Sequence, residues 1–215
     1  GAIISNGANA IDILGQYTTT AGFTNNYTQS AINNNNGSTY ALGFYQPADV
    51  EIDAVNHRAF VADVVNARVL VYNLDANNNL IDKTPDFVLG QTNFTSVSSG
   101  LTASKFVTPV ALLYDATNNR LFVADRDHHR VLVFDVAAIT NGENAINVLG
   151  QPNFTTATAA ITQAGFDLPT GLAYDASNNR LFVGSLYSHR ILVFDVASIT
   201  NGENAIAVLG QPNFT

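Results

Sequence analysis

The sequence predicts an all-β repeat protein built from four-stranded antiparallel units, and three observations support this prediction. The segment Val-Leu-Gly-Gln-Pro-Asn-Phe-Thr at 148–155 recurs unchanged at 208–215, and a near copy with threonine in place of proline occupies 88–95. Short runs rich in Val, Leu, Ile, Phe and Tyr alternate with turns rich in Asn, Asp and Gly, which is the pattern of strands. A helical period is not sustained anywhere, although one turn fits at 136–140.

The repeat has a period of 60 residues. Gly90, Gly150 and Gly210 hold the same place in successive copies, 60 residues apart. A fourth, truncated copy ends in Leu14-Gly15-Gln16, which lies 75 residues before Gly90, so the first interval carries additional residues. A period of this length indicates a repeat architecture in which neighbouring units bury each other's apolar surfaces.

Each element of the second unit follows from local chemistry. An apolar run at 109–115 ends in Asp115, and the polar residues 116–119 then supply side chains that bond their own backbone in a hairpin turn. A second run at 120–125 and a third at 130–135 are separated by a short turn. A longer polar loop leads to the fourth run, at 145–151, which completes four antiparallel strands.

Three such units are expected, at about 47–91, 109–151 and 169–211. Four antiparallel strands per unit, repeated, are typical of the blades of a β-propeller. A lone fourth strand is expected at 10–16, followed by an Asn/Thr-rich insert at 17–43. We expect the insert to be an ordered loop, because it and its flank contain side chains worth burying: Phe23, Tyr27, Ile32, Tyr40 and Phe44.

The motif Arg120-Leu-Phe-Val-Ala-Asp125, followed by His129-Arg130-Val-Leu-Val-Phe-Asp, resembles the NHL repeat, and Ser188-His189-Arg190 repeats its central element. The form that continues into Leu-Gly-Gln-Pro-Asn-Phe-Thr is similar to NHL arrays of secreted bacterial proteins. The resemblance covers the chain except the insert, and it implies a propeller, commonly with six blades. Three units do not close an ordinary ring. The alternatives are a longer parent chain or an assembly in which neighbouring chains exchange strands.

The charge balance excludes several partner classes. The formal net charge is −8, and Lys83 and Lys105 are the two lysines of the chain. This disfavours nucleic acids and anionic membrane surfaces, which are bound mainly through lysine and arginine. No apolar run approaches the roughly 20 residues that span a bilayer, so no membrane insertion is expected. The absence of cysteine excludes disulfides, thiolate zinc sites and cysteine nucleophiles.

Two Asp-Arg pairs occupy the turn between the second and third strands. Asp63 precedes Arg68, and Asp125 precedes Arg130, by five residues each, so each pair is expected to staple its hairpin. The alternative is a ring of carboxylates on one propeller face. The third unit has a serine before Arg190, so its pair is broken.

The histidines do not form a repeating set. His129 and His189 are equivalent positions, but the first unit has Ala67 there, and His57 and His128 have no such partners. A metal site needs several ligands that converge on one point, so we expect no metal and no cofactor. There is no Gly-x-Ser-x-Gly nucleophile elbow and no Gly-rich phosphate loop, so the sequence predicts a protein that is not an enzyme.

The connections from Gln91 to Pro109 and from Gln151 to Pro169 are long for neighbouring strands. Long loops on a rigid scaffold are where binding residues are usually placed. We therefore regard the phenylalanines of the repeated Asn-Phe-Thr segment as a candidate interface, with a seal between blades as the alternative: Phe94, Phe154 and Phe214.

Five triplets fit the N-glycosylation pattern, beginning at Asn26, Asn36, Asn93, Asn153 and Asn213. Together with a polar but weakly charged composition, they favour an extracellular or cell-surface glycoprotein. The predicted function is a structural or interaction scaffold that self-assembles, or forms part of a larger propeller, and takes protein or glycan ligands. A contact that does not close would give a filament. The rival functions are a propeller enzyme of the lyase or hydrolase type and a lectin-like carbohydrate binder.

Overall fold

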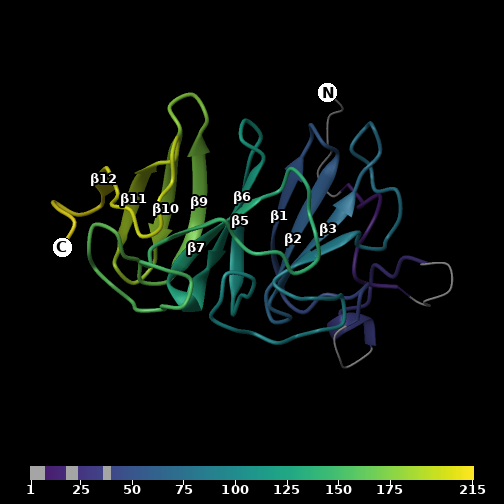
Figure 1. Ribbon diagram of the computed structural model, residues 1–215. Helices are drawn as coiled ribbons and strands as arrows, with labels where there is room; N and C mark the ends of the chain where they lie inside the picture. The colour runs from purple at the N-terminus through teal and green to yellow at the C-terminus, as the bar shows by residue number, and fades with distance from the viewer. Residues whose placement is uncertain (1–7, 18–23, 36–39) are drawn as a thin grey trace.

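The computed structural model describes residues 8–17, 24–35 and 40–215 and contains three four-stranded antiparallel sheets, one per repeat (Figure 1). The prediction of an all-β protein built from propeller blades is confirmed. Blade 1 consists of β1 (Pro47–Asp53), β2 (Arg58–Asp63), β3 (Arg68–Asn73) and β4 (Phe87–Leu89). Blade 2 consists of β5 (Pro109–Asp115), β6 (Arg120–Asp125), β7 (Arg130–Asp135) and β8 (Asn147–Leu149). Blade 3 consists of β9 (Pro169–Asp175), β10 (Arg180–Ser185), β11 (Arg190–Asp195) and β12 (Ala207–Leu209).

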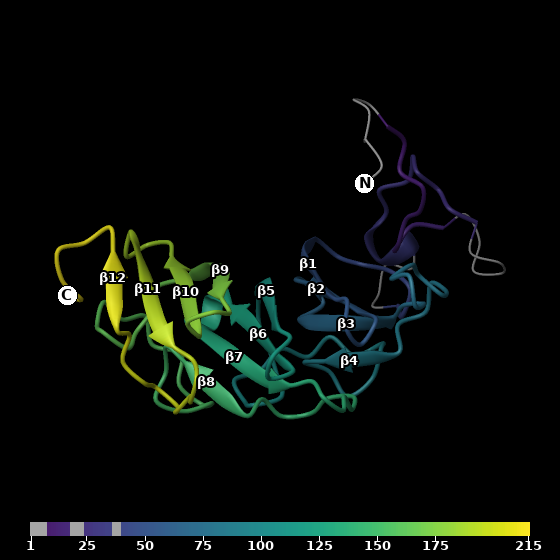
Figure 2. The ribbon, with the colours of Figure 1, turned by 90° about the horizontal axis from the view of Figure 1, so that it is seen from above.

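The blades are arranged in chain order along an open arc. The first strands β1, β5 and β9 lie next to one another, and β12 and the N-terminal segment lie at opposite ends of the molecule (Figure 2). In the described residues, η2 (Arg126–His128) is one turn of 3-10 helix, whereas η1 (Ile32–Asn35) is a turn in which Asn33 and Asn34 have left-handed backbone geometry. No helix in the described part of the chain is long and apolar enough to cross a membrane.

The hairpins close through aspartate side chains, as their spacing predicts. In blade 1, Asp53 Oδ1 accepts the backbone N–H groups of Val55 (3.1 Å) and Asn56 (2.9 Å). Asp115 does the same for the turn of blade 2. The last turn residue adopts left-handed backbone geometry, with a φ of 50° at Asn119. Asparagine tolerates this region, which explains its recurrence there.

The apolar core lies between blades. Phe60, Val69 and Leu89 of blade 1 pack with Leu132 and Phe134 of blade 2, and all five are fully buried. An equivalent core joins blade 2 to blade 3. Each strand of the middle blade is therefore covered on both surfaces, which explains why β6 is buried at every position.

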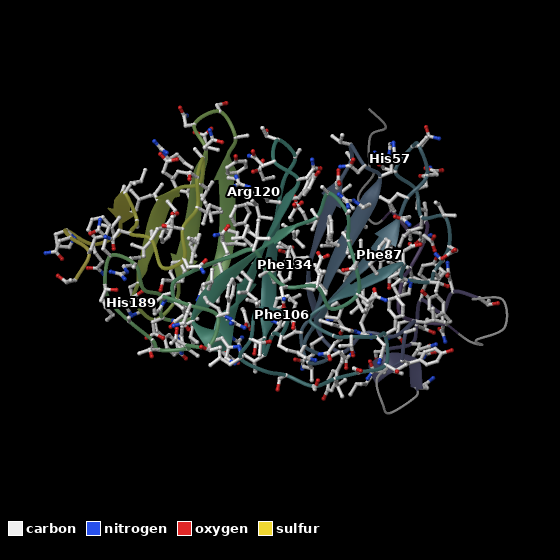
Figure 3. The ribbon with its side chains drawn as sticks, viewed as in Figure 1. His57, Phe87, Phe106, Arg120, Phe134 and His189 are labelled. Atoms are coloured by element: carbon white, nitrogen blue, oxygen red, sulfur yellow. The ribbon has the colours of Figure 1, made fainter. Side chains whose placement is uncertain are left out.

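Each long loop places one phenylalanine in these cores. Phe106 packs against Phe134 with ring centroids 5.7 Å apart, at the centre of the molecule (Figure 3). Phe166 makes the same contact with Phe194 at 5.6 Å, in an edge-to-face arrangement. Aromatic pairs of this geometry contribute about 0.5–1.5 kcal/mol beyond the burial of their area.

Backbone bonds also connect the blades at their outer strands. The N–H of Val88 donates to Asn141 Oδ1 (3.0 Å), and its carbonyl accepts the N–H of Gly142 (2.9 Å). The same two bonds join Val148 to the Asn-Gly loop of blade 3. The repeated Thr-Asn-Gly-Glu segment thus reaches back to the blade before it.

The expectation of a strand at 10–16 is wrong. Residues 10–16 have no strand geometry, and an isolated bridge joins Tyr17 to Asn25. A strand is stabilised by ladder hydrogen bonds to a neighbouring strand. None of the three sheets in the described residues includes residues 10–16. The Leu-Gly-Gln segment at 14–16 still has the local geometry of its copies. Gly15 has a φ of +83° and lies against Phe44, as Gly90 lies against Phe106.

The insert packs only in part. Tyr17 and Phe44 are buried against blade 1, whereas Tyr27 and Ile32 are exposed. Gln16 exchanges two hydrogen bonds with the backbone of Ala31, at 2.8 and 3.2 Å, which anchors the described part of the loop. Phe23 and Asn36 lie outside the described residues.

Replacing Gly150 with alanine should destabilise the protein more than the same change at Gly210. Both glycines have a positive φ, 87° and 90°, which costs about 1–2 kcal/mol for alanine. A Cβ at Gly150 would collide with the ring of Phe166, whereas the nearest atom to a Cβ at Gly210 is 3.1 Å away. Chemical denaturation should therefore show an additional loss of about 1–3 kcal/mol for Gly150→Ala. Equal losses would contradict the packing of Phe166 described above.

Candidate interaction surface

Every blade has two apolar surfaces with different neighbours. We call the surface toward the following blade the head face and the surface toward the preceding blade the tail face. The head face of blade 2 includes Phe122, Val131 and Leu149, and it packs on Leu181 and Leu192 of the tail face of blade 3. The first two blades bury their head faces in this way.

The head face of blade 3 is the exception. Phe122, Val131 and Leu149 are fully buried, but the equivalent positions on blade 3 are accessible. Ile191 is 39% exposed, Leu209 is 49% exposed, and Phe182 is half-buried. The pattern of side chains is that of an internal blade surface, so composition alone does not distinguish the exposed face from the buried ones.

The structure shows what covers such a face. In blades 1 and 2 it is the next blade, which contributes a tail face, an Asn-Gly loop and the loop that leads into its first strand. His129 takes part in this contact, because its Nδ1 accepts the N–H of Leu168 (3.2 Å). His189 holds the same position on blade 3 and is exposed at the C-terminal end of the molecule (Figure 3).

The tail face of blade 1 is covered in part. Leu14 and Phe44, from the N-terminal segment, pack on Val61 and Leu70. Burial raises the pKa of the neighbouring Tyr72 hydroxyl. Val50 and Ile52 remain exposed on β1, whereas Leu112, at the position of Val50 on the next blade, is buried.

The Asp-Arg pairs are buried clasps. Arg68 Nε donates to Asp63 Oδ2 (2.7 Å), and Arg130 Nε donates to Asp125 Oδ2 (3.0 Å), with no exposed side-chain area in either pair. Arg130 Nη1 also donates to the carbonyl of Phe154 (2.7 Å). Each arginine therefore ties its hairpin to the long loop that follows the fourth strand, a structural role rather than a ring of free carboxylates.

The third blade lacks one half of the clasp. Arg190 binds the carbonyls of Phe214 and Thr162, but Ser185 stands where the other blades have aspartate. The Nε of Arg190 is buried and has no hydrogen-bond partner in the described structure.

A second set of pairs was missed by the sequence analysis. Arg58 bonds Asp53 Oδ2 (2.5 Å) and Arg120 bonds Asp115 Oδ2 (2.6 Å) at the first hairpin of blades 1 and 2. The spacing of five residues, identical to that of the clasp, was a usable signal. In blade 3, Arg180 pairs instead with Asp195 (2.7 Å) across the sheet.

Asp125 has a pKa below its ordinary value. Burial alone would raise the pKa, but the His128 side chain, the Arg130 guanidinium and the N–H of Thr108 stabilise the carboxylate more strongly. The charged form is therefore the form that the folded state holds.

The remaining predicted site residues lie apart from one another. His57 contacts Asn78 and His128 contacts Asp125. Among residues 8–17, 24–35 and 40–215, no group of three or more His, Asp or Glu side chains could hold a metal ion. Phe94 and Phe154 are half-buried against the blade cores, which favours the sealing role over an exposed interface, and Phe214 lies likewise against blade 3.

The sequons of the repeat share one geometry. Asn93 is exposed, and its Oδ1 accepts both the N–H and the hydroxyl of Thr95 (3.0 and 3.1 Å). Asn153 repeats these bonds with Thr155. Asn213 accepts the N–H of Thr215 (3.1 Å), and all three asparagines are exposed residues.

Comparison with known proteins identifies the repeat. The NHL repeat family model matches residues 106–134, which span β5, β6 and most of β7. The chain is 26% identical to NHL repeat-containing protein 2 of Homo sapiens over 189 residues, 81% of this chain and 25% of that protein. Residues 106–134 of the chain match the NHL repeat, and its relatives are NHL repeat-containing proteins. The resemblance to secreted bacterial arrays stays a prediction.

Other relatives are similar over comparable lengths. NHL repeat-containing protein 2 of Gallus gallus is 26% identical over 76% of this chain and 23% of its own length. Protein SUPPRESSOR OF QUENCHING 1, chloroplastic, of Arabidopsis thaliana is 29% identical over 67% of this chain and 13% of its own length. The chain thus spans about a quarter, or less, of the curated relatives it matches.

A solved structure shows the same fold. The structure titled "Structure of U3-55K" superposes with a TM-score of 0.51 at 11% identity, over 78% of this chain and 40% of that chain. At this identity the likeness concerns the fold alone. A propeller-repeat fold implies, in general terms, a scaffold for protein interaction.

Asp125→Asn should lower the free energy of unfolding by about 3–5 kcal/mol at neutral pH, because it leaves Arg130 buried without its counter-charge. The folded pKa of Asp125 lies below the unfolded one. The clasp therefore stabilises the wild type above about pH 4, and this contribution is lost as the pH falls through the folded pKa.

Urea denaturation between pH 3 and 7 measures how the free energy of unfolding depends on pH. Asp125→Asn should show a flatter pH dependence than the wild type, whereas the exposed Asp82→Asn should follow the wild type. Parallel curves for the wild type and Asp125→Asn would refute the role assigned to the clasp.

Proposed function

We propose that this protein is an interaction scaffold whose blade 3 head face receives a further blade, supplied in the isolated chain by a second copy. The observation that carries the proposal is the exposure of Phe182, Ile191 and Leu209, whose counterparts on blades 1 and 2 are buried under the next blade. In a larger assembly the same face would take further repeats.

The energetic argument rests on apolar burial. Fully covering one Leu, Ile or Phe side chain contributes about 1.5–3 kcal/mol, and an exposed group of such side chains marks an interaction surface. The exposed Val50 and Ile52 on β1 belong to the opposite end of the same chain. Head-to-tail contact between copies is heterologous, so it produces a ring where the rotation closes and a filament where it does not.

The proposed role is non-catalytic and extracellular. The exposed, regularly spaced sequons at Asn93, Asn153 and Asn213 support an exported protein. No feature of the described residues favours a lyase, a hydrolase or a lectin-like carbohydrate binder over a scaffold for protein interaction. Protein partners are favoured over glycans, because the accessible surface is apolar and has the shape of a blade interface.

The double variant Ile191→Glu with Leu209→Glu should abolish self-association. Two carboxylates on the head face would be buried without partners in any blade-to-blade contact, which is strongly unfavourable. Light scattering of the wild type at tens of micromolar should give a native mass that is a multiple of 22.9 kDa, and the variant should give a single-chain mass.

A control is available in Ile161→Glu, because Ile161 is comparably exposed but lies on the loop before β9, outside the three core clusters. This variant should associate like the wild type. A single-chain mass for the wild type at every concentration would overturn self-association, and loss of association in all variants alike would show that charge, not the head face, is responsible.

Expression in a glycosylating host should add N-linked glycans at Asn93 and Asn153. Both side chains are exposed and their threonine hydroxyls already point at the asparagine. Intact mass before and after N-glycosidase treatment measures the modification, with Asn93→Gln and Asn153→Gln as controls. An unmodified secreted chain would count against the glycoprotein proposal.

A further inference from the structure

Arg190 is a buried cation without a carboxylate partner. Arg190 as a whole residue is only 4% exposed. In the described structure Arg190 forms no salt bridge, whereas Arg68 and Arg130 at the equivalent positions each pair with aspartate. The difference arises from Ser185, so the third blade carries a positive charge that the other two blades neutralise internally.

The aspartate of a complete clasp serves two sets of donors. In blade 1, Asp63 Oδ1 accepts the N–H of Tyr45 (2.7 Å) from the incoming loop. Its Oδ2 accepts the Nε of Arg68 (2.7 Å) and the amide of Asn66 (2.8 Å). Blade 2 repeats this division, with His128 in the place of Asn66.

Ser185 replaces only the first of these oxygens. Its Oγ accepts the N–H of Asp167 (2.8 Å), which is the role of Oδ1. Ser188, in the position of Asn66 and His128, donates to Ser185 Oγ (2.5 Å). No described protein atom takes the role of Oδ2, so Arg190 Nε points to a position where the other blades hold a negatively charged oxygen.

The other contacts of Arg190 do not neutralise its charge. They are the backbone carbonyls of Phe214, Thr162 and Gly165. The nearby Asp167 carboxylate lies 3.5 Å from His129 Nδ1 instead. Burial lowers the pKa of Arg190, yet a guanidinium remains protonated at neutral pH. A buried and unpaired charge of this kind is expensive.

We propose that blade 3 binds a small monovalent anion of the size of chloride at Arg190 Nε, beside Ser185 and Ser188. The anion replaces the missing carboxylate oxygen and its charge. Its size follows from the substitution, since serine has two heavy atoms fewer than aspartate, which leaves too little room for a sulfate or phosphate. Thr162 and Gly165, which bind Arg190, also line a surface cavity of about 310 Å³, so the loop that covers Arg190 borders solvent.

The test compares thermal unfolding in sodium chloride and sodium gluconate at constant ionic strength. Above its dissociation constant, each tenfold increase in chloride should raise the Tm of the wild type by about 3–5 °C. Ser185→Asp supplies the missing carboxylate, so it should be more stable than the wild type in gluconate and insensitive to chloride. Ser198→Asp adds the same charge at an exposed site and should keep the chloride dependence.

A second readout does not depend on stability. The ³⁵Cl resonance should broaden in the presence of the wild type and of Ser198→Asp, but not with Ser185→Asp. If Ser185→Asp does not fold, Arg190→Gln removes the unpaired charge and should abolish the chloride dependence. A wild-type Tm that is the same in chloride and gluconate, or a chloride effect that persists in Ser185→Asp, would overturn the proposal.

Discussion

Burial of one blade by the next is the constraint on which this structure depends. A four-stranded sheet with apolar side chains on both surfaces is not stable in water by itself, and the middle blade shows the solution, since Phe122 and Phe134 on its opposite surfaces are both fully buried. The hydrogen bonds between Val88 and the Asn141-Gly142 loop add direction to this stacking. Blades 2 and 3 both carry this loop, which fixes each of them on the blade before it.

The arginine clasps solve a different problem, which is how to hold the long loops. Arg130 joins Asp125, the carbonyl of Phe154 and the carbonyl of Lys105, so a single side chain fixes a hairpin, an outgoing loop and an incoming loop. A guanidinium suits this task because its donors are fixed in one plane. The loss of the aspartate in blade 3 leaves the loop contacts in place and changes only the charge balance.

Much of the fold followed from the sequence because the repeat supplied the register. The 60-residue step and the Asx-type turns predicted each hairpin, and the five-residue spacing predicted the clasp of Asp63 and Arg68. The strand at 10–16 was predicted wrongly, because a local motif does not reveal whether a partner strand lies beside it. The stacking of repeats predicted exposed apolar faces at the ends of the array, but the residue pattern alone did not show which face, since Val131 and Ile191 hold the same place in the repeat and only Val131 is buried. Tertiary neighbours, not residue type, decide between these two outcomes.

The backward reach of the Asn-Gly loop has a consequence for synthesis on the ribosome. The loop that binds Val148 comes from residues 201 and 202, more than fifty positions downstream. A nascent chain therefore always ends in one blade whose apolar surface is not yet covered, and that surface moves forward by one repeat as translation proceeds. Arrest at any repeat would leave an aggregation-prone intermediate with an exposed apolar blade surface. Rapid elongation or a holdase chaperone would therefore protect this protein more than faster folding of each blade would.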